Sequence, residues 1–193
     1  GKLRSRPQNT NCYFKPSVSW SDITSGNISF RYFGEGFIYD VTGMSAQNSN
    51  DSLLKQTLAF CNSKIVSWIV KSLNPTLHFQ VGNYHSLPYI DSVAKKVDVN
   101  KIKSCIDLSS QDSSLFETSF SFNYSPLTSN VLGSVDNKNY CSSKLESSYT
   151  GWIESNKSLI SNLMELEKEN NSLFIDAYGL QDELTPEVPI EQI

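Results

Sequence analysis

Several signals that would define a function class are missing from this sequence. It has no run of about 18 apolar residues, so no segment is expected to span a membrane, and no signal-peptide pattern opens it. It also has no GxxxxGK[ST] phosphate loop, no GxGxxG motif after a strand, and only two histidines, His78 and His85. We therefore expect neither a nucleotide-binding loop nor a Ser-His-acid triad, and the chain is not expected to be a catalytic domain.

Cysteine and charge are also scarce. Apolar residues make up 38% and charged residues 19% of the chain, both low for a globular protein, with Ser and Asn in their place. The cysteines, Cys12, Cys61, Cys105 and Cys141, lack the CxxC spacing of a zinc site, so no metal is expected. Scattered thiols without a secretion signal indicate reduced cysteines and a cytoplasmic protein. Because the chain opens with Gly-Lys-Leu-Arg, we expect an excised piece of a longer protein or a cleaved tag.

What the sequence does have is an uneven distribution of charge. The formal net charge is −4, but residues 1–103 carry twelve Lys and Arg against six acids, a net of +6. Residues 104–193 carry four against fourteen, a net of −10. The first half could therefore face a polyanion, whereas the second half could not.

The first half also has the stronger β-strand signals. Residues 12–42 are rich in β-branched and aromatic residues and predict two or three strands, with a hairpin-like turn at Gly34-Glu35-Gly36. The stretch GMSAQNSN at 43–50 predicts a polar loop. One helix is predicted from Asn50 to Asn74-Pro75, with a helical stripe that includes Ile65 and Trp68 packing in the core.

The remainder is predicted to be mostly helical. In order, we expect a strand at Leu77, Phe79 and Val81, a short helix over 98–114 opened by Asp98, an extended edge or loop over 115–122, a loop over 125–143, and a long helix from about Lys144 to Phe174. The acidic run Glu165, Glu167 and Glu169 predicts a solvated helix face.

Together these elements predict an α+β fold, with a small mixed β-sheet, packed helices, a long C-terminal helix and an irregular tail. The expected organisation is a basic linker over 1–11, an α+β domain over 12–122, a loop over 123–143, and the helix with its tail over 144–193.

Five stretches carry a resemblance to a known family. They are FKPSVSWSDITS (14–25), FRYFGEGFIYDVTG (30–43), LAFCNSKIVSWIVKSLNPTLHFQVGNYHSLP (58–88), LFETSFSF (115–122) and LFIDAYGLQDELTPEV (173–188). In this order they resemble the C-terminal region of the PglX family, the adenine-specific DNA methyltransferases of BREX phage-defence systems. The first three also resemble, more loosely, the target-recognition domains of TaqI-like and type IIG methyltransferases.

The resemblance implies a DNA-recognition module without catalytic activity of its own. Such a module would hold double-stranded DNA for a separate N-terminal methyltransferase domain that binds S-adenosylmethionine. The fragment itself is expected to bind no cofactor, because the glycine motif and the Asn-Pro-Pro-Tyr motif of the parent enzymes are not in it. Since cations contact DNA phosphates, the candidate DNA-binding residues are Lys15, Arg31, Lys64 and Lys71.

Several alternatives stay open at this point. Arg31 could instead stack on an aromatic ring or pair with an acid such as Asp40, and Lys64 could be a solvated residue. The whole chain could also be a protein-interaction module, in which the acidic half and its tail dock on the methyltransferase core or on another phage-defence subunit. An unrelated globular scaffold is a third, less specific reading.

Overall fold

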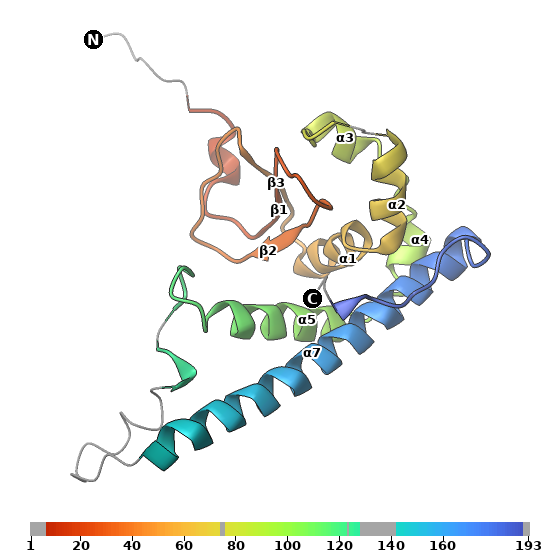
Figure 1. Ribbon diagram of the computed structural model, residues 1–193. Helices are drawn as coiled ribbons and strands as arrows, with labels where there is room; N and C mark the ends of the chain where they lie inside the picture. Colours follow the sequence, from red (N-terminus) through yellow and green to blue (C-terminus); the bar gives the residue numbers. More distant parts are fainter. Residues whose placement is uncertain (1–6, 74–75, 123, 128–141, 191–193) are drawn as a thin grey trace, which may run out of the picture. The chain divides into compact units, whose positions relative to one another are not determined.

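The computed structural model of the protein describes residues 7–73, 76–122, 124–127 and 142–190. Its elements are η1 (Thr10–Cys12), β1 (Ser17–Ser21), β2 (Arg31–Phe33), β3 (Gly43–Gln47), α1 (Asp51–Cys61), α2 (Lys64–Leu73), α3 (Val81–His85), α4 (Asp91–Ala94), α5 (Val99–Ser113) and α7 (Ser142–Tyr178) (Figure 1). The fold is therefore α+β, as predicted. Among the described residues, no helix is long and apolar enough to cross a membrane.

The chain forms two compact units. The first consists of Gly1–Ile102 and Asn170–Pro186, and the second of Lys103–Glu169 and Glu187–Ile193. The first unit holds eleven Lys and Arg against nine acids, a net of +2, and the second holds five against eleven, a net of −6. The segment Asn170–Pro186, which comprises the end of α7 and the residues after it and is called the C-terminal tail below, thus brings acids to the basic half. The predicted division at 12–122, 123–143 and 144–193 stays a prediction.

The sheet of the first unit has three antiparallel strands in the order β2-β1-β3. Strand β3 lies where the sequence predicted a polar loop over 43–50, so that prediction was wrong; all five residues of β3 pair with β1. The predicted hairpin at Gly34–Gly36 was also wrong, because β2 pairs with β1 and the residues after the turn form no strand. The wider loop from β2 instead crosses to the other side of β1.

The two faces of this sheet differ in chemistry because residues paired across strands point to the same face. Val18 pairs with Tyr32 and Ala46, and Val18 is fully buried. Ser19 pairs with Arg31 and Ser45 on the opposite face. Strand β3 is polar in sequence because half of it lies on this serine-rich face, which explains why it was mistaken for a loop.

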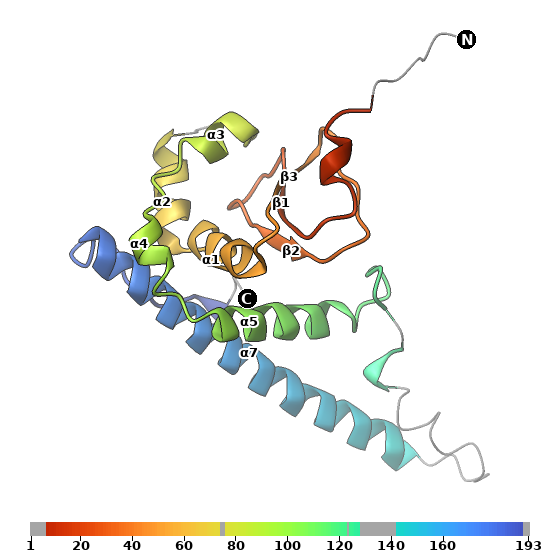
Figure 2. The same ribbon diagram turned by 180° about the vertical axis from the view of Figure 1, so that it is seen from behind.

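The helix predicted over 50–74 is two helices. Asn50 caps α1, its side chain accepting a hydrogen bond from Leu53 N at 3.2 Å, as its position before the apolar run predicted. The chain then breaks at Asn62-Ser63. The Asn62 side chain accepts from Phe30 N at 2.9 Å and donates to Phe30 O at 2.8 Å. The break therefore fixes the backbone just before β2, and α2 starts in a new direction at Lys64 (Figure 2).

The strand predicted at Leu77, Phe79 and Val81 is not formed. This segment makes one isolated bridge, between Ile23 and His78, and then enters α3. Leu77 is 60% and Val81 44% exposed, whereas Phe79 is 2% exposed. Of the three alternating apolar residues, only Phe79 is buried in the core, so their alternation does not mark a half-buried strand.

The C-terminal tail completes the core of the first unit. Phe174 and Ile175 are 1% and 3% exposed, and the Phe174 ring centroid lies 5.7 Å from that of Phe60. The Tyr178 hydroxyl donates to the Pro88 carbonyl. Gly179, at φ +69°, ends α7 with Leu180 N donating to Ile175 O at 3.1 Å, as expected for a left-handed helix C-cap.

One side chain ties this tail to α2. Asn171 is 4% exposed, and its Oδ1 accepts from the backbone N–H of Lys64, the first residue of α2, at 2.9 Å. Its Nδ2 donates to Pro186 O at 3.1 Å. The first N–H groups of a helix lack partners within the helix, so Asn171 serves as a cap supplied from another part of the chain.

The helices predicted over 98–114 and 144–174 are both confirmed with slightly different ends, and most of each belongs to the second unit. Asp98 opens α5, accepting from Asn100 N at 2.9 Å. Leu159 and Leu163 of α7 are each 7% exposed. Residues 115–122 form turns, so the loop alternative holds there. Most of the loop predicted over 125–143 lies outside the described residues.

Candidate nucleic-acid interface

Helix α2 presents a face on which two lysines flank a tryptophan. Lys64, Trp68 and Lys71 are spaced i, i+4 and i+7, which places them on one side of a helix. Trp68 is 41% exposed, so its predicted place in the core was wrong. In nucleic-acid-binding proteins, cations contact phosphates, and an exposed aromatic ring beside them can stack on an unpaired base. We call these three residues the α2 face.

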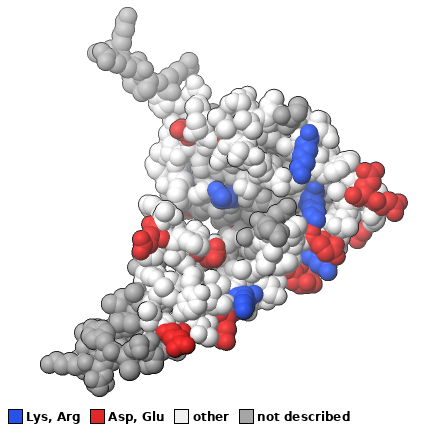
Figure 3. Space-filling view, in the orientation of Figure 1, with Lys and Arg blue, Asp and Glu red and all other residues white. Residues whose placement is uncertain are grey.

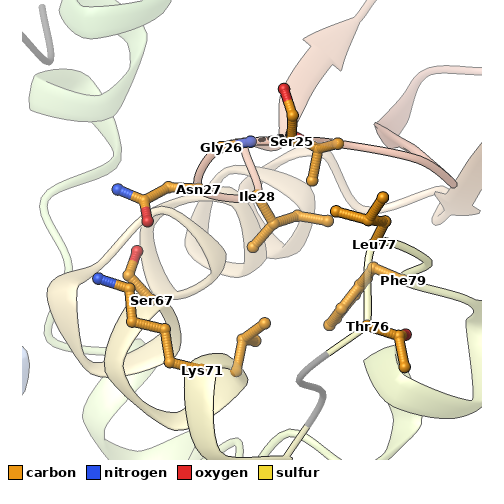
Figure 4. A pocket seen from close by; sticks show the side chains of 11 residues that line it. Ser25, Gly26, Asn27, Ile28, Ser67, Lys71, Thr76, Leu77 and Phe79 are labelled. Carbon is orange, nitrogen blue, oxygen red and sulfur yellow. Dashed lines mark hydrogen bonds between the residues drawn. The ribbon is translucent and has the colours of Figure 1, made fainter.

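A pocket of about 460 Å³ lies next to the C-terminal end of this face. Its walls are the β1–β2 connection at 24–28, the α2 residues Ser67, Val70 and Lys71, and the segment Thr76, Leu77 and Phe79. In Figure 4, Asn27, Ser67 and Lys71 lie on one side of the pocket, and Leu77 and Phe79 lie across from them. The pocket therefore has a polar side and an apolar side.

Arg31 is exposed at the start of β2, on the serine-rich face of the sheet. In the described part of the chain it has neither an acidic partner nor an aromatic ring within cation–π distance. Asp40, the acid proposed as its partner, accepts hydrogen bonds from Thr42 and Gly43 instead, and these lower the pKa of its carboxyl. The two aromatic neighbours of Arg31 in the sequence point away from its side chain. Phe30 is buried, and the Tyr32 hydroxyl donates to Asp51.

Lys15 lies in the segment that leads into β1, and it is exposed. Its neighbour Phe14 adopts φ +63° and exchanges backbone hydrogen bonds with the turn after β2, from Phe14 N to Phe37 O at 3.0 Å and from Gly36 N to Phe14 O at 3.1 Å. Lys15 is therefore held next to that turn. The structure brings Lys64 and Lys71 together on one helix, and it places Lys15 and Arg31 on other elements of the first unit.

The basic side chains do not form one continuous patch on the face shown in Figure 3. Some Lys and Arg follow one another in a narrow column at the right of that view, and others lie singly among uncharged and acidic surface. Lys55 is already occupied, since it pairs with Asp51 and its Nζ lies 5.6 Å from the centroid of the Tyr32 ring. Burial, with the hydrogen bond to Asp51, raises the pKa of Tyr32 to about 12. The α2 face is thus the densest set of candidate residues on one element.

Sequence reasoning missed Trp68, Asn27 and Ser67. The spacing of Trp68 from Lys64 and Lys71 was available in the sequence, but one continuous helix was assumed. Asn27 and Ser67 meet only because the β1–β2 connection folds against α2. No periodic pattern links two polar residues forty positions apart.

The described residues contain no cluster of three or more His, Cys, Asp or Glu that could hold a metal ion. Burial raises the pKa of the Cys61 thiol, and burial together with Glu167 raises that of Cys105 to about 11. Both thiols therefore stay protonated near neutral pH and are unsuited to act as nucleophiles.

Comparison with known proteins defines the class: the chain matches part of adenine-specific methyltransferases. The adenine-specific methyltransferase PglX of Lacticaseibacillus casei (strain Zhang) is 34% identical over 187 residues, which cover 97% of this chain and 15% of that protein. The adenine-specific methyltransferase BrxX of Escherichia coli O9:H4 (strain HS) is 25% identical over 191 residues, 95% of this chain and 14% of that protein. No protein-family model matches. The chain is therefore similar to a fragment of a BREX methyltransferase, as its motifs predicted.

Proposed function

We propose that the chain is the DNA-recognition segment of an adenine-specific DNA methyltransferase that acts in phage defence. It binds duplex DNA through its first unit and presents the DNA to a separate methyltransferase domain. The observation that carries the proposal is the 34% identity to PglX over 97% of the chain, in a match that spans only 15% of that protein. Because the chain itself has no glycine motif after a strand, we assign it to recognition and not to cofactor binding.

The surface of the first unit supports the proposal. The α2 face offers the exposed Lys71 for a phosphate, with the half-buried Lys64 and the exposed Trp68 beside it, and Arg31 and Lys15 add exposed cations elsewhere on the first unit. Duplex DNA is held mainly through phosphate contacts from Lys and Arg, while base edges supply specificity. The net charge of +2 on the first unit and −6 on the second favours DNA contact by the first.

We further propose that S-adenosylmethionine binds to the other domain of the parent protein. The sequence has neither a glycine motif after a strand nor an Asn-Pro-Pro-aromatic motif. The chain alone is therefore expected to transfer no methyl group from S-adenosylmethionine to mixed-sequence DNA. A radiolabelled methyl-transfer assay on the purified chain tests this, and clear turnover would refute it.

Charge reversal tests the proposed DNA contact. Arg31→Glu or Lys15→Glu is expected to weaken duplex binding about tenfold, or ~1.4 kcal/mol, and to reduce the slope of log K against log salt by about 1. The matched control is Glu165→Lys on α7, where an exposed acid of the second unit is reversed. Fluorescence anisotropy with labelled duplex at several salt concentrations measures both quantities.

Two outcomes would contradict this placement of the DNA. Equal affinity of the Arg31→Glu and Glu165→Lys variants, in well-folded protein, would mean that the DNA lies on another face. An unfolded Arg31→Glu variant would mean that Arg31 is a structural cation, because exposed charge changes normally alter stability by less than about 0.5 kcal/mol.

A protein-interaction module is the second candidate. It is favoured by exposed apolar residues on α7, where Leu145 and Tyr149 are 57% and 52% exposed in a unit of net charge −6. Phe174 and Ile175 of the tail are buried in the first unit, so a partner such as the methyltransferase core would have to meet other residues. A module of this kind would show no salt-dependent DNA binding in the same titration.

A further inference from the structure

The pocket beside the α2 face has walls that are fixed to one another. Thr24 N donates to Leu77 O at 3.1 Å and Phe79 N donates to Asp22 O at 2.7 Å. The Trp20 indole N–H donates to Phe79 O at 3.0 Å. The β1–β2 connection and the segment at 76–79 are therefore joined across one end of the sheet, and the pocket between them and α2 is preformed.

Polar groups of three side chains lie on one side of this pocket. The amide of Asn27, the hydroxyl of Ser67 and the ammonium of Lys71 face the same space (Figure 4). None of the three side chains has a hydrogen bond or ion pair with another described residue. The described lining includes no Asp or Glu. A cation beside a hydroxyl and an amide that can both donate, with no opposing carboxylate, suits an anion, and a phosphate group above all.

The opposite side is apolar. Phe79 and Ile28 are 2% and 9% exposed and form the floor, while Leu77, at 60% exposed, stands at the edge. An anion alone would gain nothing from these side chains. The size of about 460 Å³ and the division into a polar and an apolar side suit a phosphate that carries a sugar and a base.

We propose that this pocket takes one nucleotide of the bound DNA strand, with the phosphate on Asn27, Ser67 and Lys71 and the sugar against Ile28 and Leu77. This inference rests on the proposed function, because the nucleotide comes from the DNA that the chain is proposed to bind. A nucleotide within DNA and a free deoxynucleotide carry the same phosphate, sugar and base. The test therefore has one arm for DNA and one for the free nucleotide.

In the first arm, anisotropy measures the binding of a labelled duplex to the full chain across a salt series. Ser67→Leu, which leaves every charge in place, is expected to weaken binding about tenfold with an unchanged salt slope. Lys71→Gln is expected to weaken binding by a similar factor and to lower the slope by about 1. Lys96→Gln, at an exposed lysine of the same unit, is the control and should bind within about twofold of the parent chain.

In the second arm, deoxyadenosine monophosphate and inorganic phosphate are titrated separately while amide resonances are followed by NMR. If the amide chemical shifts of Ser67 and Lys71 change more with the nucleotide than with phosphate, the result supports a pocket in which the apolar side contacts the sugar. Thermal unfolding of Ser67→Leu and of a milder variant, Asn27→Ala, shows whether each is folded.

The results separate the two proposals. If the parent chain binds DNA but folded Ser67→Leu and Asn27→Ala bind equally well at every salt concentration, the pocket inference is overturned and the proposed function stands. If the parent chain shows no salt-dependent DNA binding, the proposed function fails. The nucleotide arm then decides alone: shifts at the pocket support a free-nucleotide site, and their absence overturns the inference.

Discussion

The Phe174→Ala variant should lose about 3–5 kcal/mol of its free energy of unfolding. Phe174 is 1% exposed, and its ring packs on that of Phe60, which is itself 1% exposed. Removing the ring leaves a cavity in the core of the first unit, at the point where the tail packs on α1. Because a domain of this size is stable by about 5–15 kcal/mol, the loss would be a large share of the total.

Urea denaturation followed by circular dichroism measures this loss. Phe120→Ala is the matched control, because Phe120 is 99% exposed and its removal should change the unfolding free energy by less than about 0.5 kcal/mol. Similar midpoints for the two alanine variants would show that residues 170–186 are not packed in the first unit.

The Asn171→Ala variant should lose about 2–4 kcal/mol, because two polar groups lose their partners at once. These are the Lys64 N–H at the start of α2 and the Pro186 carbonyl. DNA affinity should fall with it, since the orientation of the α2 face depends on this cap. The measurement is again urea denaturation, combined with the anisotropy titration.

Two further substitutions sharpen this test. Asn162→Ala removes an exposed asparagine from the same helix and should be nearly neutral. Asn171→Asp keeps an acceptor for the Lys64 N–H but cannot donate to Pro186 O, so its stability should fall between those of the parent chain and the alanine variant. An aspartate as damaging as alanine would mean that the cap itself contributes little.

The elements that could be predicted are those encoded by local signals. Asn50 before an apolar run marked the start of α1, and Asp98 marked that of α5. The acidic and apolar periodicity of α7 predicted a long helix. In each case the determining residues lie within a few positions of the element, which is the range over which sequence patterns are informative.

The elements that could not be predicted depend on residues far away in the chain. Strand β3 is polar because one side of it shares the serine-rich face of β1, a fact that requires the pairing to be known. Trp68 was assigned to the core by extending the stripe of α1 through residue 72. The break at Asn62-Ser63 changes the direction of the helix, so residues after it follow a different phase.

The candidate site shows the same division. The charge pattern found the exposed cations Lys15, Arg31 and Lys71, but the polar side of the pocket needs the β1–β2 connection folded against α2. The motif that made the family resemblance most specific, LFIDAYGLQDEL, supplies core residues such as Phe174 and Ile175. Its specificity thus reflects how the tail packs.

The cap on α2 also has a consequence for synthesis on the ribosome. Lys64 and its partner Asn171 are 107 residues apart, so at translation rates of ~5–20 residues per second the cap emerges about 5–20 s after the helix it serves. During that interval the nascent chain exposes the aromatic surface around Phe60 that Phe174 later covers. The first unit can therefore complete its core only after its last seventeen residues, Asn170–Pro186, have left the exit tunnel.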